Sequence, residues 1–157
     1  MHIDIYSDGS SRGNPGPGGY GCIIRCVDRY GITQEREYSA GFLLTTNNRM
    51  ELLGVITALE KLKYMCDVTV YTDSQYVVKP YTEGWIFGWK KNGWKNSSGE
   101  VKNKDLWIRL DGLVNRHKVK FVWIKGHDGH PENERCDKLA VEAAEGDLLK
   151  VDEGYRG

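Results

Sequence analysis

Hydrophobic periodicity changes along the chain in an order that few folds accommodate. Residues 3–8, 20–27 and 32–44 show the alternation or apolar content of three strands joined by turns. After them, we expect strands at 68–72 and 119–124 and helices at 47–64, 74–81, 105–115 and 131–144. Residues 83–99 fit neither pattern. The order βββαβαβα predicts an α/β protein whose five-stranded mixed sheet carries helices on both faces.

The length and composition indicate one globular domain. The chain has 157 residues, 28% of them charged and 39% hydrophobic, with no internal repeat or dividing linker, which excludes disordered and fibrous classes. Residues 147–157 are expected to form an acidic tail after a domain at 1–146. No signal peptide is evident and no apolar run approaches the roughly 18 residues of a membrane helix, so we expect a cytoplasmic protein.

The charges are balanced overall but unevenly placed. The 22 basic and 22 acidic side chains cancel, yet residues 85–104 hold five lysines against one glutamate. The four cysteines lack Cys-x-x-Cys spacing, which favours buried thiols over a disulfide framework. A local basic surface can bind a polyanion whatever the net charge, because the local field governs association.

Two aspartates end strands that we expect to run in parallel. Asp8 follows the first strand within Tyr-Ser-Asp-Gly-Ser, and Asp73 follows the strand at 68–72 within Tyr-Thr-Asp-Ser-Gln. Ligands bind beyond the carboxyl ends of such strands. Each aspartate could instead cap the following turn or helix, which is the more common role of either one alone.

Two further carboxylates lie toward apolar helix faces. At 100° per residue, Glu51 shares the angle of Val55, Ala58 and Leu62, and Asp137 lies at the edge of an apolar stripe in the last helix. A buried carboxylate needs a cation, a basic partner or access to water.

Convergence of these four carboxylates would favour hard divalent cations. Without matching basic residues the acids repel one another, and oxygen ligands prefer Mg²⁺ or Mn²⁺ to zinc. Two such ions about 4 Å apart can activate a water and stabilise the leaving oxygen of a phosphodiester. His127, between two glycines of a loop, could move protons near neutral pH, or it could be an ordinary solvated histidine.

Five sequence runs together resemble bacterial-type ribonuclease HI over residues 3–145. These are YSDGS at 6–10, GNPGPGGYG at 13–21, TTNNRMEL at 45–52, TDSQYV at 72–77, and the stretch from KGH at 125–127 to ERCD at 134–137. The resemblance implies the ribonuclease H fold and a monomeric endonuclease that uses Mg²⁺, with Mn²⁺ able to substitute. Such an enzyme cuts the RNA strand of RNA/DNA hybrids and leaves 3′-hydroxyl and 5′-phosphate ends.

The resemblance also assigns roles to individual residues. The metal-binding carboxylates it implies are Asp8, Glu51, Asp73 and Asp137, with His127 as a mobile general acid and base. Contacts to the RNA strand are implied for Ser11, Asn14 and Gln75, and contacts to the DNA strand for Thr46, Asn47 and Asn48. Asparagine and serine in a Gly/Pro loop are also ordinary turn formers.

Residues 85–95 combine three tryptophans and three lysines, a composition suited to a sugar-phosphate backbone. The resemblance places a basic protrusion here, with Trp85 as its channel aromatic. We expect Lys90, Lys91, Trp94 and Lys95 to contribute to substrate binding, and some tryptophans of the segment to lie in the core.

Two other functions fit part of the pattern. A hybrid-binding or duplex-binding module without catalysis would explain the basic aromatic segment, but four acids would hinder binding of a polyanion. A related nuclease acting on DNA would explain the carboxylates, but it leaves Asn14 and Gln75 without a role.

Overall fold

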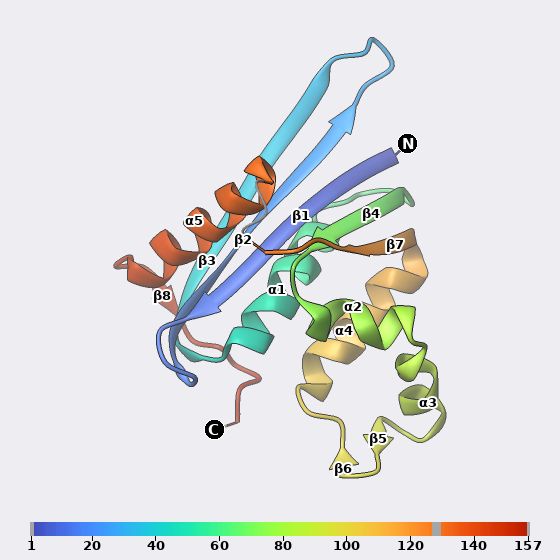
Figure 1. Cartoon of the computed structure of the whole chain (residues 1–157), viewed down its shortest axis with the longest axis vertical. Helices are drawn as coiled ribbons and strands as arrows, with labels where there is room; N and C mark the ends of the chain where they lie inside the picture. Colours follow the sequence, from blue (N-terminus) through green and yellow to red (C-terminus); the bar gives the residue numbers. More distant parts are fainter. Residues whose placement is uncertain (1, 127–129, 157) are drawn as a thin grey trace.

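The computed structural model describes residues 2–126 and 130–156, and it shows a twisted sheet between layers of helices (Figure 1). Its elements are β1 (His2–Ser11), β2 (Gly16–Val27), β3 (Thr33–Thr45), α1 (Asn47–Glu60), β4 (Asp67–Thr72), α2 (Gln75–Thr82), α3 (Trp85–Lys91), β5 (Lys95–Asn96), β6 (Gly99–Glu100), α4 (Lys104–Arg116), β7 (Lys118–Trp123), α5 (Pro131–Glu145) and β8 (Leu149–Lys150).

The strand order of the main sheet is β7-β4-β1-β2-β3-β8. The β1–β2 and β2–β3 pairs are antiparallel, whereas β4 pairs in parallel with both β1 and β7. The mixed sheet predicted from the alternation of strands and helices is therefore confirmed, with its five long strands as expected.

Helices α1 and α5 cover opposite faces of the sheet. Within β2, the side chain of Tyr20 faces Gly54 of α1, while Gly21 lies against the backbone of α5 at Cys136. Successive residues of a strand point to opposite faces, so the two helices are on different sides. The close approach of α5 requires glycine at position 21, because a Cβ atom there would overlap the α5 backbone.

The apolar core lies mainly between the sheet and α1. The side chains of Ile5, Val55 and Val70 are fully buried there, and Trp107 of α4 closes the core at the α2 side, where Tyr81 and Trp89 pack against it. Burial of this kind contributes about 1.5–3 kcal/mol per large side chain and holds the strands in register.

The structure adds short elements that periodicity does not detect. Residues 83–99, unassigned from the sequence, form α3 and part of the small β5–β6 hairpin, and β8 adds a sixth strand beside β3. Two-residue strands are too short to show alternation. The predicted helix at 47–64 ends at Glu60, where the Lys61 amide donates to the Ala58 carbonyl and the Leu62 amide donates to the Leu59 carbonyl.

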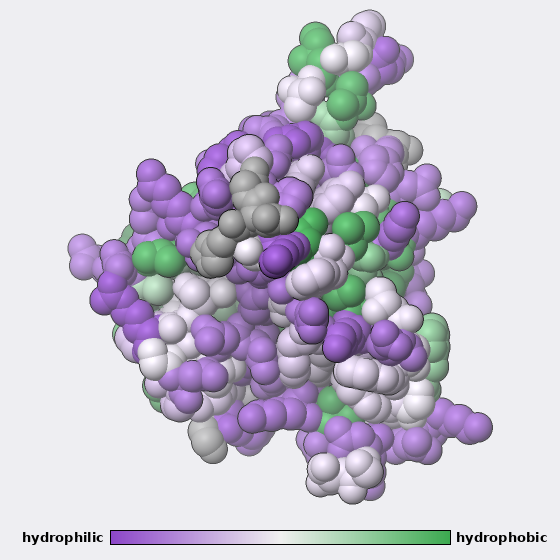
Figure 2. Space-filling model, viewed as in Figure 1, coloured by the Kyte–Doolittle hydropathy of each residue, from purple (hydrophilic) through white to green (hydrophobic). Residues whose placement is uncertain are grey.

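The surface is mostly hydrophilic on the side shown in Figure 2. An apolar patch at the top of that view is the tip of the β2–β3 hairpin, which projects beyond the sheet and exposes Val27 and Ile32. Among the described residues, no helix is long and apolar enough to cross a membrane. All four cysteines are free thiols, and three of them are buried.

Candidate metal-binding active site

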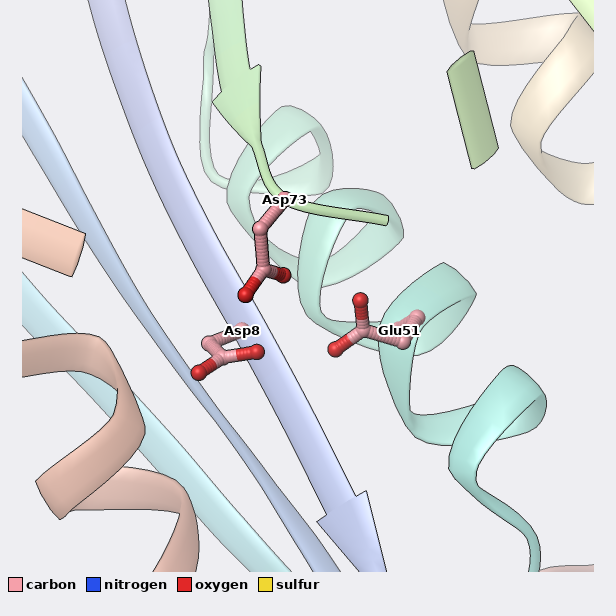
Figure 3. A group of neighbouring side chains, drawn as sticks. All are labelled: Asp8, Glu51 and Asp73. Atoms are coloured by element: carbon pink, nitrogen blue, oxygen red, sulfur yellow. The ribbon is translucent and has the colours of Figure 1, made fainter. Parts of the chain in front are cut away.

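Three carboxylates from three different elements meet at one place on the sheet. Asp8 lies in β1, Glu51 in α1, and Asp73 directly after β4 (Figure 3). One oxygen from each lies within 4.8 Å of the others. The parallel register of β1 and β4 pairs Tyr6 with Tyr71, and two residues further along the same register sets Asp8 beside Asp73. This is the juxtaposition that the two strand-end motifs predict.

Glu51 reaches the two aspartates because α1 passes unusually close to β1. A Cβ atom at Gly9 would overlap the backbone of Met50 and Glu51, so only glycine permits this approach. The Gly9 amide donates hydrogen bonds to the carboxylates of both Glu51 and Asp8. The prediction that Glu51 lies on the buried face of its helix is confirmed, since only 8% of it is exposed.

The capping alternative for Asp73 does not hold. Ser74 is the N-cap of α2, and its hydroxyl accepts the Val77 amide at 3.3 Å. Asp8 lies inside a continuous strand that extends to Ser11, so it caps no turn either. Both carboxylates are thus directed into the cluster.

Burial and mutual repulsion shift the pKa values of two carboxylates in the cluster. Burial and the nearby Asp73 carboxylate raise the pKa of Asp8 to about 7. Burial and the Asp8 carboxylate also raise the pKa of Glu51 above its ordinary range. Among the described residues, no lysine or arginine is a leading influence on either group. Three crowded oxygen donors are suited to a hard divalent cation such as Mg²⁺ or Mn²⁺.

Asp137, the fourth predicted carboxylate, is not part of this three-membered group. Asp137 lies in α5, partly buried and on the side of the sheet that Asp8 faces, and its charge also raises the pKa of Asp8. His127 lies outside the described residues. Its neighbour Gly126 is packed against the Asp73 carboxylate, so the chain after β7 passes directly beside the cluster.

A polar network joins the first loop to the start of α1. The Asn47 Oδ1 atom accepts hydrogen bonds from the Ser11 amide at 2.7 Å and the Ser11 hydroxyl at 3.1 Å. The Asn47 amide in turn donates to the Asn14 side chain at 3.2 Å. Thr46 caps α1 by accepting the Arg49 amide. These contacts hold Ser11, Asn14 and Asn47 together at the end of β1.

Two other predicted contact residues remain accessible at the ends of helices. Asn48 is exposed in the first turn of α1, and Gln75 is exposed at the start of α2, two residues after Asp73. Their positions leave both side chains available near the cluster.

The basic aromatic segment divides into core and surface residues. Trp89 and Trp94 pack against the core, while Trp85 is 49% exposed at the start of α3. Lys90 pairs with Asp111 of α4 at 2.9 Å. Lys91 and Lys95 are exposed, and among the described residues neither has an ion-pair partner.

Sequence reasoning did not identify the role of Arg49. This side chain is almost completely buried beneath the start of α1 and forms ion pairs with Asp105 at 2.8 Å and with Asp152 at 2.7 Å. The sequence feature that could have indicated this role is an arginine two positions before Glu51, in a helix that is mainly apolar. Its acidic partners come from distant segments and carry no recognisable spacing.

We expect Asp8→Asn to stabilise the metal-free protein at pH 8 by about 2 kcal/mol, or about 4–8 °C in Tm, because it removes a buried charge beside Asp73. A carboxyl whose pKa is raised in the folded state destabilises the fold most at pH values above that pKa. It has no such effect at pH values below its pKa in the unfolded chain. The gain should therefore vanish near pH 4. Thermal unfolding with and without Mg²⁺ checks this, and Mg²⁺ should stabilise the wild type more than the variant. Equal stabilisation by Mg²⁺ would contradict a metal site at Asp8.

Comparison with known proteins agrees with the fold and the acidic cluster. The RNase H family model matches residues 1–145. The ribonuclease H of Lachnoclostridium phytofermentans is 56% identical over 97% of this chain and 98% of that protein.

Solved structures are similar over nearly the same length. LC9-RNase H1, a type 1 RNase H with the type 2 active-site motif, matches with a TM-score of 0.84 and 36% identity over 94% of this chain and 74% of that one. LC11-RNase H1 in complex with an RNA/DNA hybrid matches with a TM-score of 0.66 and 32% identity, over 91% and 96% of the two chains. With its βββαβαβα core and its three carboxylates at one place on the sheet, this chain belongs to the ribonuclease H family.

Proposed function

We propose that this protein is an endonuclease that hydrolyses the RNA strand of RNA/DNA hybrids, leaving 3′-hydroxyl and 5′-phosphate ends. The observation that carries the proposal is the cluster of Asp8, Glu51 and Asp73 in a member of the ribonuclease H family. The similarity to a structure described as a complex with an RNA/DNA hybrid supports the choice of substrate.

The residues of the cluster fit a pair of divalent cations. Asp8, Glu51 and Asp73 would hold Mg²⁺, or Mn²⁺ in its place, with Asp137 of α5 completing the set. When bound, such ions supply Lewis-acid activation of water and stabilise negative charge at the leaving oxygen. The Gly9 amide holds Glu51 in place, and the parallel pairing of β1 and β4 holds the two aspartates side by side, so the site is preorganised.

His127 is proposed to transfer a proton to the leaving group and to assist product release. Its sequence neighbour Gly126 lies against Asp73, which supports a position within reach of the reaction. An imidazole is suited to this role because its pKa lies near neutrality.

Substrate choice is proposed to depend on the polar groups around the cluster. Ser11, Asn14 and Gln75 would contact the RNA strand, where the 2′-hydroxyl distinguishes RNA from DNA. Thr46, Asn47 and Asn48, at the start of α1, would hold the DNA strand. The network supports this proposal, since it connects Ser11 and Asn14 of the first group with Asn47 of the second.

A cleavage assay tests the proposed function. Labelled RNA/DNA hybrid, single-stranded RNA, double-stranded RNA and duplex DNA are each incubated with the protein and Mg²⁺, and the products are separated on a gel. Cleavage confined to the RNA of the hybrid is expected. Binding without cleavage in either Mg²⁺ or Mn²⁺ would indicate a binding module, and cleavage of duplex DNA would indicate a nuclease of different specificity.

The exposed end of the basic segment should contact phosphate. We expect Lys91→Ala combined with Lys95→Ala to weaken hybrid binding and to lower the slope of log affinity against log salt by about 2, with little change in turnover. Lys90→Ala should change the slope less, because Asp111 already neutralises Lys90. Fluorescence anisotropy over a KCl series measures the slopes, and an unchanged slope in the double variant would exclude phosphate contact. Trp85 would supply the aromatic part of this surface, whereas Trp94, which was expected to contribute to binding, packs against the core.

The predicted domain at 1–146, a monomeric state and a cytoplasmic location stay predictions.

A further inference from the structure

The acidic C-terminal tail is anchored to the folded domain. Its β8 strand pairs in parallel with β3 at Gly41 and Phe42. Beyond β8, the Asp152 side chain is only 5% exposed. Its carboxylate accepts hydrogen bonds from Arg49 Nε at 2.7 Å, from Arg49 Nη2 at 3.0 Å and from the Thr45 hydroxyl at 2.7 Å. Asp152 thus fixes the tail to β3 and α1.

The chain after Asp152 follows a defined path. The Tyr155 amide donates to the Asp152 carbonyl at 3.1 Å, which forms a turn. Within this turn, Gly154 lies so close to the Arg49–Asp105 ion pair that a Cβ atom would overlap both side chains. The turn therefore packs against the ion pair, and this contact fixes the positions of Tyr155 and Arg156.

Tyr155 and Arg156 line a polar groove of about 720 Å³ beside the start of α1. Its lining includes Asn14 and Asn48, Lys102 and Lys104, and Tyr155 and Arg156 from the tail. Asn48 precedes Glu51 by three residues, so the groove begins about 4.5 Å along the helix axis from a residue of the carboxylate cluster.

The charges of the groove favour an anion. Its lining has four basic side chains, Arg49, Lys102, Lys104 and Arg156, against two acidic ones, Glu100 and Asp105. Arg49 pairs with Asp105 and with Asp152 behind the groove, and Lys104 lies 4.0 Å from Glu100. Among the described residues, Lys102 and Arg156 have no ion-pair partner. The tail's other acid near the turn, Glu153, lines a separate cavity and not this groove. The end of an acidic tail therefore presents a cation, a hydroxyl and neighbouring amides, all of which can donate hydrogen bonds to phosphate oxygens.

We propose that the C-terminal segment is part of the nucleic-acid-binding surface, where Arg156 and Tyr155 contact the sugar-phosphate backbone of the substrate in this groove. The inference rests on the proposed function and extends it, because it adds residues beyond the 1–145 span that the family model matches. Asp152 acts as a positioning residue that holds the segment in place.

The test compares Arg156→Ala with Lys63→Ala, each in the inactive Asp8→Asn protein. Lys63 is a matched control, because it is an exposed lysine just past the far end of α1, without an ion pair among the described residues. Binding to a labelled RNA/DNA hybrid is measured by anisotropy between 50 and 200 mM KCl. Arg156→Ala should lower the slope of log affinity against log salt by about 0.9, so the loss of affinity across this range shrinks about threefold. Lys63→Ala should leave the slope unchanged.

Two further variants separate charge from structure. Arg156→Lys should keep most of the wild-type slope of log affinity against log salt that Arg156→Ala loses, since lysine keeps the positive charge. Asp152→Asn should lower both the slope and the Tm, whereas Arg156→Ala should leave the Tm unchanged. A slope in Arg156→Ala equal to that of Lys63→Ala overturns the proposal. Cleavage of the same hybrid by the wild type is measured in parallel: absence of cleavage contradicts the proposed function, whereas cleavage with an unchanged slope overturns the role of the tail alone.

Discussion

The Asp8→Asn variant is expected to cut RNA in a hybrid at least about 10³-fold more slowly than the wild type while keeping the same fold. The substituted amide side chain would have the same size and could still accept the Gly9 amide, but it would lack the negative charge that a divalent cation needs from the centre of the cluster. Single-turnover cleavage in Mg²⁺ measures the rate, and circular dichroism checks the fold.

Asp4→Asn is the matched control for this variant. Asp4 lies on the same strand, four residues earlier and on the same face, and its carboxylate contacts His2 instead of the cluster. Its rate should stay within about twofold of the wild type. An Asp8→Asn protein with wild-type activity would exclude Asp8 from the catalytic site.

Arg49→Ala is expected to lower the free energy of unfolding by about 3–5 kcal/mol, or about 10 °C in Tm. The substitution leaves the buried Asp152 carboxylate without its guanidinium and removes the bidentate partner of Asp105. Urea denaturation followed by circular dichroism measures the loss.

The same variant has a predicted pH dependence. Bonds from Arg49 hold the pKa of Asp105 below its ordinary value, despite partial desolvation. A carboxyl of this kind stabilises the fold above its unfolded pKa and loses that effect as pH falls through the folded pKa. The difference in free energy of unfolding between Arg49→Ala and the wild type should therefore become smaller below about pH 4.

Arg109→Ala is the control for Arg49→Ala. Arg109 also pairs with a carboxylate, Glu60, at 3.0 Å, but both side chains are more than 40% exposed. An exposed pair contributes about 0–1 kcal/mol. If the two arginine variants lost equal stability, burial would not be the cause of the effect at Arg49.

Much of the fold could be predicted because its long elements carry strong periodicity. The strands around Ile5 and Val70 and the helix containing Glu51 each bury an apolar face. The alternation of strands and helices in the second half of the chain predicts parallel strand pairing there, as found for β4 with β1 and β7. The same reasoning anticipated that Asp8 and Asp73 would lie side by side, since parallel strands end at the same edge.

The remainder depended on contacts between distant segments. The Trp89 and Trp94 side chains resemble Trp85 in the sequence, and only packing in the folded core, such as that of Trp89 against Trp107, separates core from surface. Lys90 and Lys91 are adjacent, yet Asp111, from a different helix, neutralises one of them.

The sequence by itself determined the order of the long elements, the burial of Glu51 and the placement of Asp8 beside Asp73, because each follows from local periodicity and strand direction. Only the tertiary structure decided that Asp152 binds Arg49, that the tail adds strand β8, and that Arg156 lies in a groove beside the start of α1. These contacts join residues about a hundred positions apart. Their partners are chosen by complementary charge and shape in the folded protein, and no local pattern records that choice.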